Sequence, residues 1–380
     1  MRKTICLGDM ATYINGYAFK PADWGTKGLP IIRIQNLTDS GKDYNYYEGE
    51  VKEKYLVRKG DVLISWSASI GVYEWEKEDA WLNQHIFKVV FDKGEVDKRY
   101  FKYATGYVLE KSLQYAHGST MKHLTKGAFD KLPIPIYDLK EQRVIAEKIG
   151  KVDEAIFECE AMLADFELLV KSRFIEMFGD PVRNPMNWEK GVLKDITSKI
   201  GSGATPKGGN ASYKNEGISL IRSMNVHNGY FDYKGLAHID GEQASLLDNV
   251  NIESNDVLLN ITGASVARCC VVPDDILPAR VNQHVCILRC KDDILPMFLN
   301  AVLISDQYQA KLWNIAEAGA TRQALSKEKI ETFQIILPPI SLQKQFANFV
   351  DLIDKSKLTI QKSMDNLQEL RDSLLQEYFG

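Results

Sequence analysis

Several features that commonly announce an activity are missing from this 380-residue sequence. No apolar run approaches the roughly 18–20 residues that span a bilayer. The basic start at 1–16 lacks the apolar stretch of a secretion signal. The six cysteines are scattered, unlike the disulfide framework of a small secreted protein. We therefore expect a cytoplasmic protein.

An excess of basic charge, which is usual in nucleic-acid-binding proteins, is also missing, because the net charge is −4. The charge is unevenly spread, however. Residues 141–178 contain nine acidic and five basic residues, and this difference equals the net charge of the whole chain. The remainder is neutral overall, which permits a basic face on it.

No catalytic or nucleotide-binding motif is complete. The stretch GSGATPKGG at 201–209 lacks the order of a phosphate-binding loop, and Pro206 stands where the dinucleotide-binding pattern needs its third glycine. The segment NPMNW at 184–188 is not the Asn/Asp-Pro-Pro-aromatic signature of adenine methyltransferases. A zinc site is an alternative that the spacing does not favour, since there is no Cys-x-x-Cys pair. Its ligands would be Cys269, Cys270, His284, Cys286 and Cys290.

The sequence does contain a duplication, which divides it into tandem units of about 1–179 and 180–380. The units end alike, in RFIEMFG and LLQEYFG. Repeated segments include LPIIRIQNL (29–37) with ISLIRSMNV (218–226), GDVLISWSASIG (60–71) with NDVLLNITGASVA (255–267), and LNQHIFKVVF (82–91) with VNQHVCILRC (281–290).

Each unit ends in a long predicted helix. Apolar residues recur at alternating steps of four and three, which is the coiled-coil period. Each helix could pack on its own domain, but we favour pairing of the two, antiparallel as an internal symmetry would require. The two frames are Ile145, Ile149, Val152, Ile156, Cys159, Leu163, Phe166, Val170, Arg173, Met177 and Phe346, Val350, Ile353, Lys357, Ile360, Met364, Leu367, Arg371, Leu374, Tyr378.

The part of each unit before its long helix is predicted to be mixed. Amphipathic patterns predict helices at 97–116 and 297–316. Runs rich in β-branched residues are typical of short strands; examples lie at 31–34, 61–66, 256–261 and 285–289.

In this order, the segments resemble the specificity subunit of type I restriction–modification systems. The resemblance covers essentially the whole chain. It is carried by GSGATPKGG, SLIRSMNV, the two Asn-Gln-His strands, and the helix entries LPIPIYDLKEQRVIAEKIGKVDEAI and LPPISLQKQFANFVDLID. It implies an α+β fold with two mixed α/β target-recognition domains in tandem repeat. Two long helices, forming an antiparallel coiled coil with internal pseudo-two-fold symmetry, would separate them. The implied bounds are 1–140 and 180–340 for the domains, and 141–179 and 341–380 for the spacer helices.

The resemblance also implies a function. Each domain would read one half of a bipartite, asymmetric double-stranded DNA site, while the helices set the gap and dock two methylation subunits. Those subunits would bring S-adenosylmethionine, and two restriction (motor–nuclease) subunits would bring ATP and Mg. The chain itself would be non-catalytic, with no cofactor or metal. The alternatives are a stand-alone two-domain DNA-binding regulator, an enzyme with an unrecognised site, and a scaffold that binds only proteins.

Base reading requires polar or basic side chains at loop tips or strand ends. Any one of them could instead be solvated or contact only phosphate. Asn83-Gln84-His85 and Asn282-Gln283-His284 could be structural or could face DNA, and their sameness favours a structural role. The candidate DNA-binding residues are Lys20, Lys27, Arg33, Gln35, Asn36, Ser67, Ser69, His117, Lys122 and His123 in the first unit, and Thr205, Lys207, Arg222, Ser223, Asn225, Thr262, Ser265, Arg268, Thr321 and Arg322 in the second.

Overall fold

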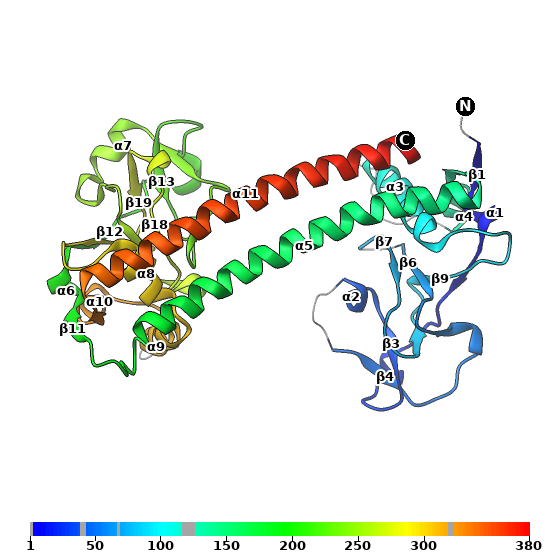
Figure 1. Cartoon of the computed structure of the whole chain (residues 1–380), viewed down its shortest axis with the longest axis horizontal. Helices are drawn as coiled ribbons and strands as arrows, with labels where there is room; N and C mark the ends of the chain where they lie inside the picture. The colour runs from blue at the N-terminus through cyan, green and yellow to red at the C-terminus, as the bar shows by residue number, and fades with distance from the viewer. Residues whose placement is uncertain (1–2, 39–42, 67–68, 116–125, 318–322) are drawn as a thin grey trace. The chain divides into compact units, whose positions relative to one another are not determined.

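The chain folds into two compact units, each of which contains strands, short helices and parts of both long helices (Figure 1). The computed structural model describes residues 3–38, 43–66, 69–115, 126–317 and 323–380. Unit 1 is Met1–Glu160 with Gln361–Gly380, and unit 2 is Ala161–Ile360. The predicted α+β class is confirmed. None of the helices in the described ranges is both long and apolar enough to cross a membrane.

Unit 1 contains two four-stranded sheets, whose strands are blue to cyan in Figure 1. One is antiparallel with the order β2-β9-β6-β7, and the other has the order β4-β3-β8-β5 with β3 and β8 parallel. β1 pairs with β10 just before the first long helix. The elements are β1 (Thr4–Cys6), α1 (Leu7–Met10), β2 (Thr12–Asn15), β3 (Leu29–Ile32), α2 (Ile34–Leu37), β4 (Asn45–Tyr47), β5 (Leu56–Val57), β6 (Val62–Ser65), β7 (Gly71–Glu74), β8 (Ala80–Leu82), β9 (Ile86–Val90), α3 (Lys98–Tyr115), α4 (Lys126–Asp130) and β10 (Pro133–Pro135).

Unit 2 repeats this plan. An antiparallel sheet has the order β12-β20-β17-β18, and a second sheet has the order β16-β13-β19 with β13 and β19 parallel. β11 pairs with β21 just before the second long helix. The elements are β11 (Glu189–Val192), α6 (Leu193–Ile196), β12 (Thr197–Ser202), β13 (Ile218–Ile221), β14 (Val226–His227), β15 (Tyr230–Phe231), β16 (Ala237–Ile239), α7 (Gly241–Ser245), β17 (Val257–Asn260), β18 (Cys269–Val271), β19 (Ala279–Val281), β20 (Val285–Cys290), α8 (Pro296–Ile304), α9 (Asp306–Glu317), α10 (Lys327–Glu331) and β21 (Gln334–Leu337).

The two long helices are α5 (Leu139–Phe178) and α11 (Ile340–Phe379), with 40 residues each. Every position of the two predicted seams is buried or half-buried, as a paired seam requires. Within unit 1, Arg371 Nε of α11 lies 2.6 Å from Asp153 Oδ1 of α5, and Lys148 Nζ donates to Tyr378 OH at 3.0 Å. From the first pair to the second, the residue number falls along α5 and rises along α11, so the two helices run antiparallel in unit 1.

The core of each unit is completed by both long helices. In unit 1, Ile149 of α5 and Phe379 of α11 lie in one cluster with Tyr100 and Phe129. In unit 2, the Phe174 and Phe346 rings are 5.6 Å apart, and both belong to the main core. The predicted pairing of the helices with each other is therefore confirmed within each unit.

One predicted helix is interrupted. The segment 297–316 forms α8 and α9, separated by Ser305, whose backbone is extended (φ −62°, ψ 143°). Ser305 Oγ donates to the carbonyl of Val302 at 2.7 Å, and the Ser305 carbonyl accepts from the N–H of Gln309 at 2.8 Å. Serine competes for backbone partners in this way and favours helix ends over interiors. Of the segment predicted at 97–116, by contrast, Lys98–Tyr115 form the single helix α3.

Candidate nucleic-acid interface

In each unit, two loops start side by side at the ends of parallel strands. Ile32 at the end of β3 is in register with Leu82 at the end of β8, and Ile221 at the end of β13 is in register with Val281 at the end of β19. Parallel strands end at the same edge of a sheet, so the segments that follow, beginning at 33 and 83 or at 222 and 282, lie together. In each unit, the loop that begins with an arginine (Arg33 or Arg222) therefore lies beside the loop that begins with Asn-Gln-His (at Asn83 or Asn282).

A glycine after the first long strand of each unit allows a third loop to approach. A Cβ on Gly16 would lie 2.1 Å from the carbonyl oxygen of Asn83, and one on Gly203 would lie 1.8 Å from that of Val281. Only glycine fits at such distances. The Gly203 N–H also donates to the Asn282 carbonyl at 3.1 Å. Near its start, the glycine-rich stretch at 201–209 therefore lies directly against the backbone at Val281 and Asn282.

The asparagines of the two Asn-Gln-His triplets are buried in their loops. Asn83 and Asn282 are 7% and 4% exposed. Their backbone N–H groups donate to Ile32 and Ile221 at 3.2 and 3.0 Å, which ties each loop to the neighbouring parallel strand. Asn282 Oδ1 also accepts from the backbone N–H of His284 at 2.9 Å and closes the turn.

The next two residues belong to a chain of hydrogen-bonded side chains in unit 2. Thr205 Oγ1 donates to Gln283 Oε1, the Gln283 amide contacts His284 Nε2 at 3.0 Å, and His284 Nδ1 lies 2.6 Å from Thr262 Oγ1. If the Gln283 amide donates, His284 accepts at Nε2 and donates from Nδ1, as the neutral ring can. Gln283 is exposed and the other three are half-buried. Gln283 and His284 thereby link Thr205 and Thr262, which were both predicted to bind DNA.

A four-residue turn, Arg-x-x-Asn, follows the first strand of each parallel pair. The backbone N–H of Arg33 donates to Asn36 Oδ1, and that of Arg222 donates to Asn225 Oδ1, both at 3.0 Å. The backbone angles agree closely, with φ −111° and ψ 162° at Arg33 and φ −116° and ψ 163° at Arg222. The turn is therefore part of the shared framework.

An aromatic ring lies beneath each of these arginines. The Arg33 guanidinium carbon is 4.8 Å from the centroid of Trp24, and that of Arg222 is 5.3 Å from Tyr213. Both rings precede their arginine by nine residues. Sequence reasoning missed the two rings, although this repeated spacing was a usable signal.

Asn225, predicted to contact DNA, is held by hydrogen bonds within its own loop. Its side chain is fully buried. Its amide donates to the carbonyls of Asp232 at 2.9 Å and Lys234 at 3.4 Å, while its Oδ1 caps the turn. These bonds hold the loop together, and a contact between Asn225 and DNA stays a prediction. Sequence reasoning missed the burial of this side chain, which depends on carbonyls seven and nine residues later in the chain.

The remaining predicted residues occupy several loops. Lys27 precedes β3 and so lies at the opposite end of that strand from Arg33, while Lys20, Ser69 and Lys207 are exposed. Gln35 and Asn36 are half-buried in α2, and Ser223 and Ser265 are half-buried in short turns.

The predicted residue Arg268 lies beside two aromatic rings. Its Nη1 is 3.5 Å from His227 Nδ1, and the His227 ring stacks on that of exposed Tyr230. Sequence reasoning missed His227 and Tyr230. Ser67, His117, Lys122, His123, Thr321 and Arg322 lie outside the described residues.

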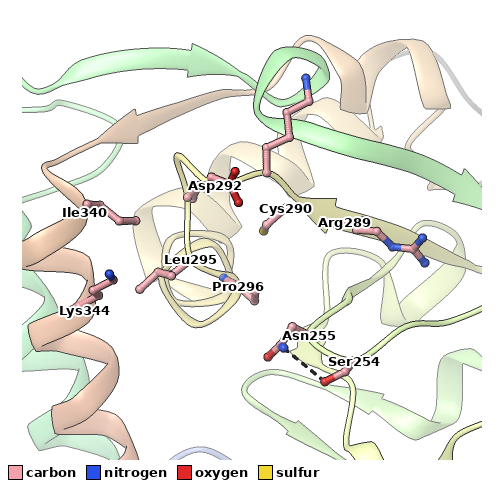
Figure 2. A pocket seen from close by; sticks show the side chains of 11 residues that line it. Ser254, Asn255, Arg289, Cys290, Asp292, Leu295, Pro296, Ile340 and Lys344 are labelled. Atoms are coloured by element: carbon pink, nitrogen blue, oxygen red, sulfur yellow. Dashed lines mark hydrogen bonds between the residues drawn. The ribbon is translucent and has the colours of Figure 1, made fainter.

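The hollow shown in Figure 2 is separate from these loops. It lies where β20 ends and α8 and α11 begin, whereas the Asn-Gln-His loop lies at the start of β20. Arg289, at its edge, is held by both carboxylate oxygens of Asp256, at 2.8 and 2.9 Å. The Lys291 ammonium group donates to the Asp195 carbonyl at 2.7 Å. These cations serve the fold of unit 2.

The cysteines considered for zinc pack in apolar cores. Cys269 and Cys286 belong to one buried cluster and Cys270 to another. Burial raises the pKa of Cys270, Cys286 and Cys290 to about 12, so these thiols stay protonated at neutral pH. A cysteine binds zinc as its thiolate. Within the described ranges, no group of three or more His, Cys, Asp or Glu side chains is placed to hold a metal ion.

Comparison with known proteins identifies the family. The model of the type I restriction modification DNA specificity domain matches residues 2–163 and again residues 185–370. The chain belongs to this specificity-subunit family. The two matches agree with the tandem repeat in the sequence.

Relatives of this specificity subunit match it over most of this chain. The type I restriction enzyme EcoBI specificity subunit of Escherichia coli is 25% identical, over 99% of this chain and 85% of that protein. The S subunit structure from M. genitalium has a TM-score of 0.57 at 16% identity, covering 100% of this chain and 96% of that chain. A chain from a structure on complex assembly and conformational transition of the type I R-M system has a TM-score of 0.60 at 16% identity, covering 99% and 97%.

Membership fixes the general role. A specificity subunit is the DNA-recognition component of a type I restriction–modification system and assembles with its other subunits, without being the catalytic component itself.

Proposed function

We propose that each unit of this specificity subunit reads one half of a bipartite, asymmetric site in double-stranded DNA. The observation that carries the proposal is a shared loop framework with unlike tips. Between the fixed arginine and asparagine of the turn, unit 1 has Ile34-Gln35 and unit 2 has Ser223-Met224. Two copies of one framework with different side chains suit two different short sequences, whereas identical copies would suit a palindrome.

We also propose that α5 and α11 set the gap between the half-sites. A helix of 40 residues measures about 60 Å at 1.5 Å per residue. One turn of B-DNA advances about 34 Å. A rigid pair of this length suits half-sites separated by more than one turn.

The same helices would dock two methylation subunits. Large apolar side chains on them are more than half exposed, which favours a partner surface. They are Phe157, Leu168, Leu352 and Leu358. In the proposed complex, S-adenosylmethionine belongs to the methylation subunits, and ATP and Mg belong to two restriction subunits. The chain would bind no cofactor of its own and would act in the cytoplasm, where its DNA is.

The test is to purify the chain alone and together with the methylation subunits of its own system. We expect the complex to methylate adenines in DNA and to bind its site tightly. The chain alone should bind weakly and should neither methylate nor cleave DNA. If the chain alone bound DNA tightly and specifically, and did not bind the methylation subunits, a stand-alone DNA-binding regulator would be favoured instead.

A further inference from the structure

Arg33 and Arg222 have matching surroundings. Each follows the first strand of the parallel pair, has its backbone N–H bound to the asparagine three residues later, and lies over an aromatic ring. A side chain that selects a sequence should differ between units that read different half-sites. One that contacts the common phosphate backbone has no reason to differ.

The two guanidinium groups also lack an acidic partner among the described residues. Arg33 Nη1 donates to the amide oxygen of Asn45 at 3.0 Å, and Arg222 Nη2 donates to the carbonyl of Gly235. By contrast, Arg280 and Arg289 are neutralised by Asp248 and by Asp256 with Glu253.

An arginine held by a ring and one neutral oxygen keeps its full positive charge. Arg33 and Arg222 are only half-buried, so the charged fork remains within reach of a ligand. A planar guanidinium with free N–H groups matches the oxygens of a phosphate. The ring beneath it limits the side chain's motion, which lowers the entropic cost of the contact.

We propose that Arg33 and Arg222 are equivalent phosphate-contacting residues, one in each half-site, and that neither reads bases. This inference rests on the proposed function, because it assumes that each unit binds DNA. It separates a common docking contact from the variable residues that carry sequence information.

The experiment measures DNA affinity against salt concentration for the complex of the full chain with its methylation subunits. Each phosphate contact contributes about 0.9 to the slope of log K against log salt on B-DNA. We expect Arg222→Gln and Arg33→Gln each to reduce the magnitude of the slope by about 0.9 on specific and non-specific DNA alike. Methylation sequencing should return the recognition sequence unchanged.

Two control variants sharpen the test. Met224→Ala alters an uncharged, 46% exposed residue in the same turn and should leave the slope unchanged. Arg222→Lys keeps the charge without the fork and should retain the slope while weakening binding. Thermal unfolding of each variant checks that it is folded.

Three results would overturn the proposal. They are an altered base preference with an unchanged slope, no effect on affinity or slope, and an equal fall in slope for Met224→Ala. A wild-type complex without any sequence preference would instead refute the proposed function itself.

Discussion

Adjacent residues of the Asn-Gln-His triplet have different tasks in unit 2. Asn282 is buried and closes its turn through the backbone of His284. Gln283 is exposed and joins the side-chain chain that begins at Thr205. The asparagine is buried in both units, and its backbone N–H ties each loop to the neighbouring parallel strand.

A pair of substitutions separates these tasks. Asn282→Ala removes a buried acceptor and should lower the free energy of unfolding by about 1–3 kcal/mol. Gln283→Ala should leave stability within about 0.5 kcal/mol, because the side chain is exposed. It should weaken DNA binding without changing the bases selected, since Gln84 occupies the same place in unit 1. Urea unfolding measures stability, and a DNA-binding titration with methylation sequencing measures the second effect. Equal destabilisation by both changes would contradict this division.

Two glycines near the end of β12 offer a second residue-scale test. Gly203→Ala would place a Cβ against the Val281 carbonyl and should destabilise the chain by about 1–3 kcal/mol. Gly201→Ala is the matched control, because its Cβ would meet nothing within 4 Å. Thermal unfolding of both variants measures the effect, and Gly201→Ala should be neutral or slightly stabilising. Similar effects at both positions would show that the close approach is absent.

At the scale of elements, local periodicity was the strongest signal in the sequence. It correctly predicted the buried seams of α5 and α11 and the helix α3, because one face of a helix is encoded by neighbouring residues. It missed the break at Ser305, where a side chain competes for backbone partners. It also missed the parallel pairing of β3 with β8, which joins strands about 50 residues apart and has no local pattern. It also gave no sign that Asn225 is buried, with its amide donating to the carbonyl of Asp232.

The helix pairing gives a prediction at this scale. Phe346 is fully buried against Phe174 and Phe178, so Phe346→Ala should cost about 3–5 kcal/mol of stability. Leu352→Ala, on the same helix but 63% exposed, should cost less than about 0.5 kcal/mol. If the exposed residues dock a methylation subunit, Leu352→Ala should still weaken that association. Denaturant unfolding of the chain and a binding titration with the subunit measure the two effects.

At the scale of the whole molecule, the two units share their strand pairing, their Arg-x-x-Asn turn and their contribution from both long helices. They differ at the loop tips. The sequence was sufficient to recognise the duplication, but it could not identify which polar side chains are buried. The internal two-fold relation between the units stays a prediction.

The most direct test of the account is to sequence the methylated adenines in the DNA of cells that carry the intact system. The account predicts one asymmetric motif of two unlike short sequences separated by a gap of constant length. Changing Met224, which stands where unit 1 has Gln35, should then alter only one of the two sequences. A single uninterrupted motif, or two identical halves, would contradict the claim that the units read different DNA.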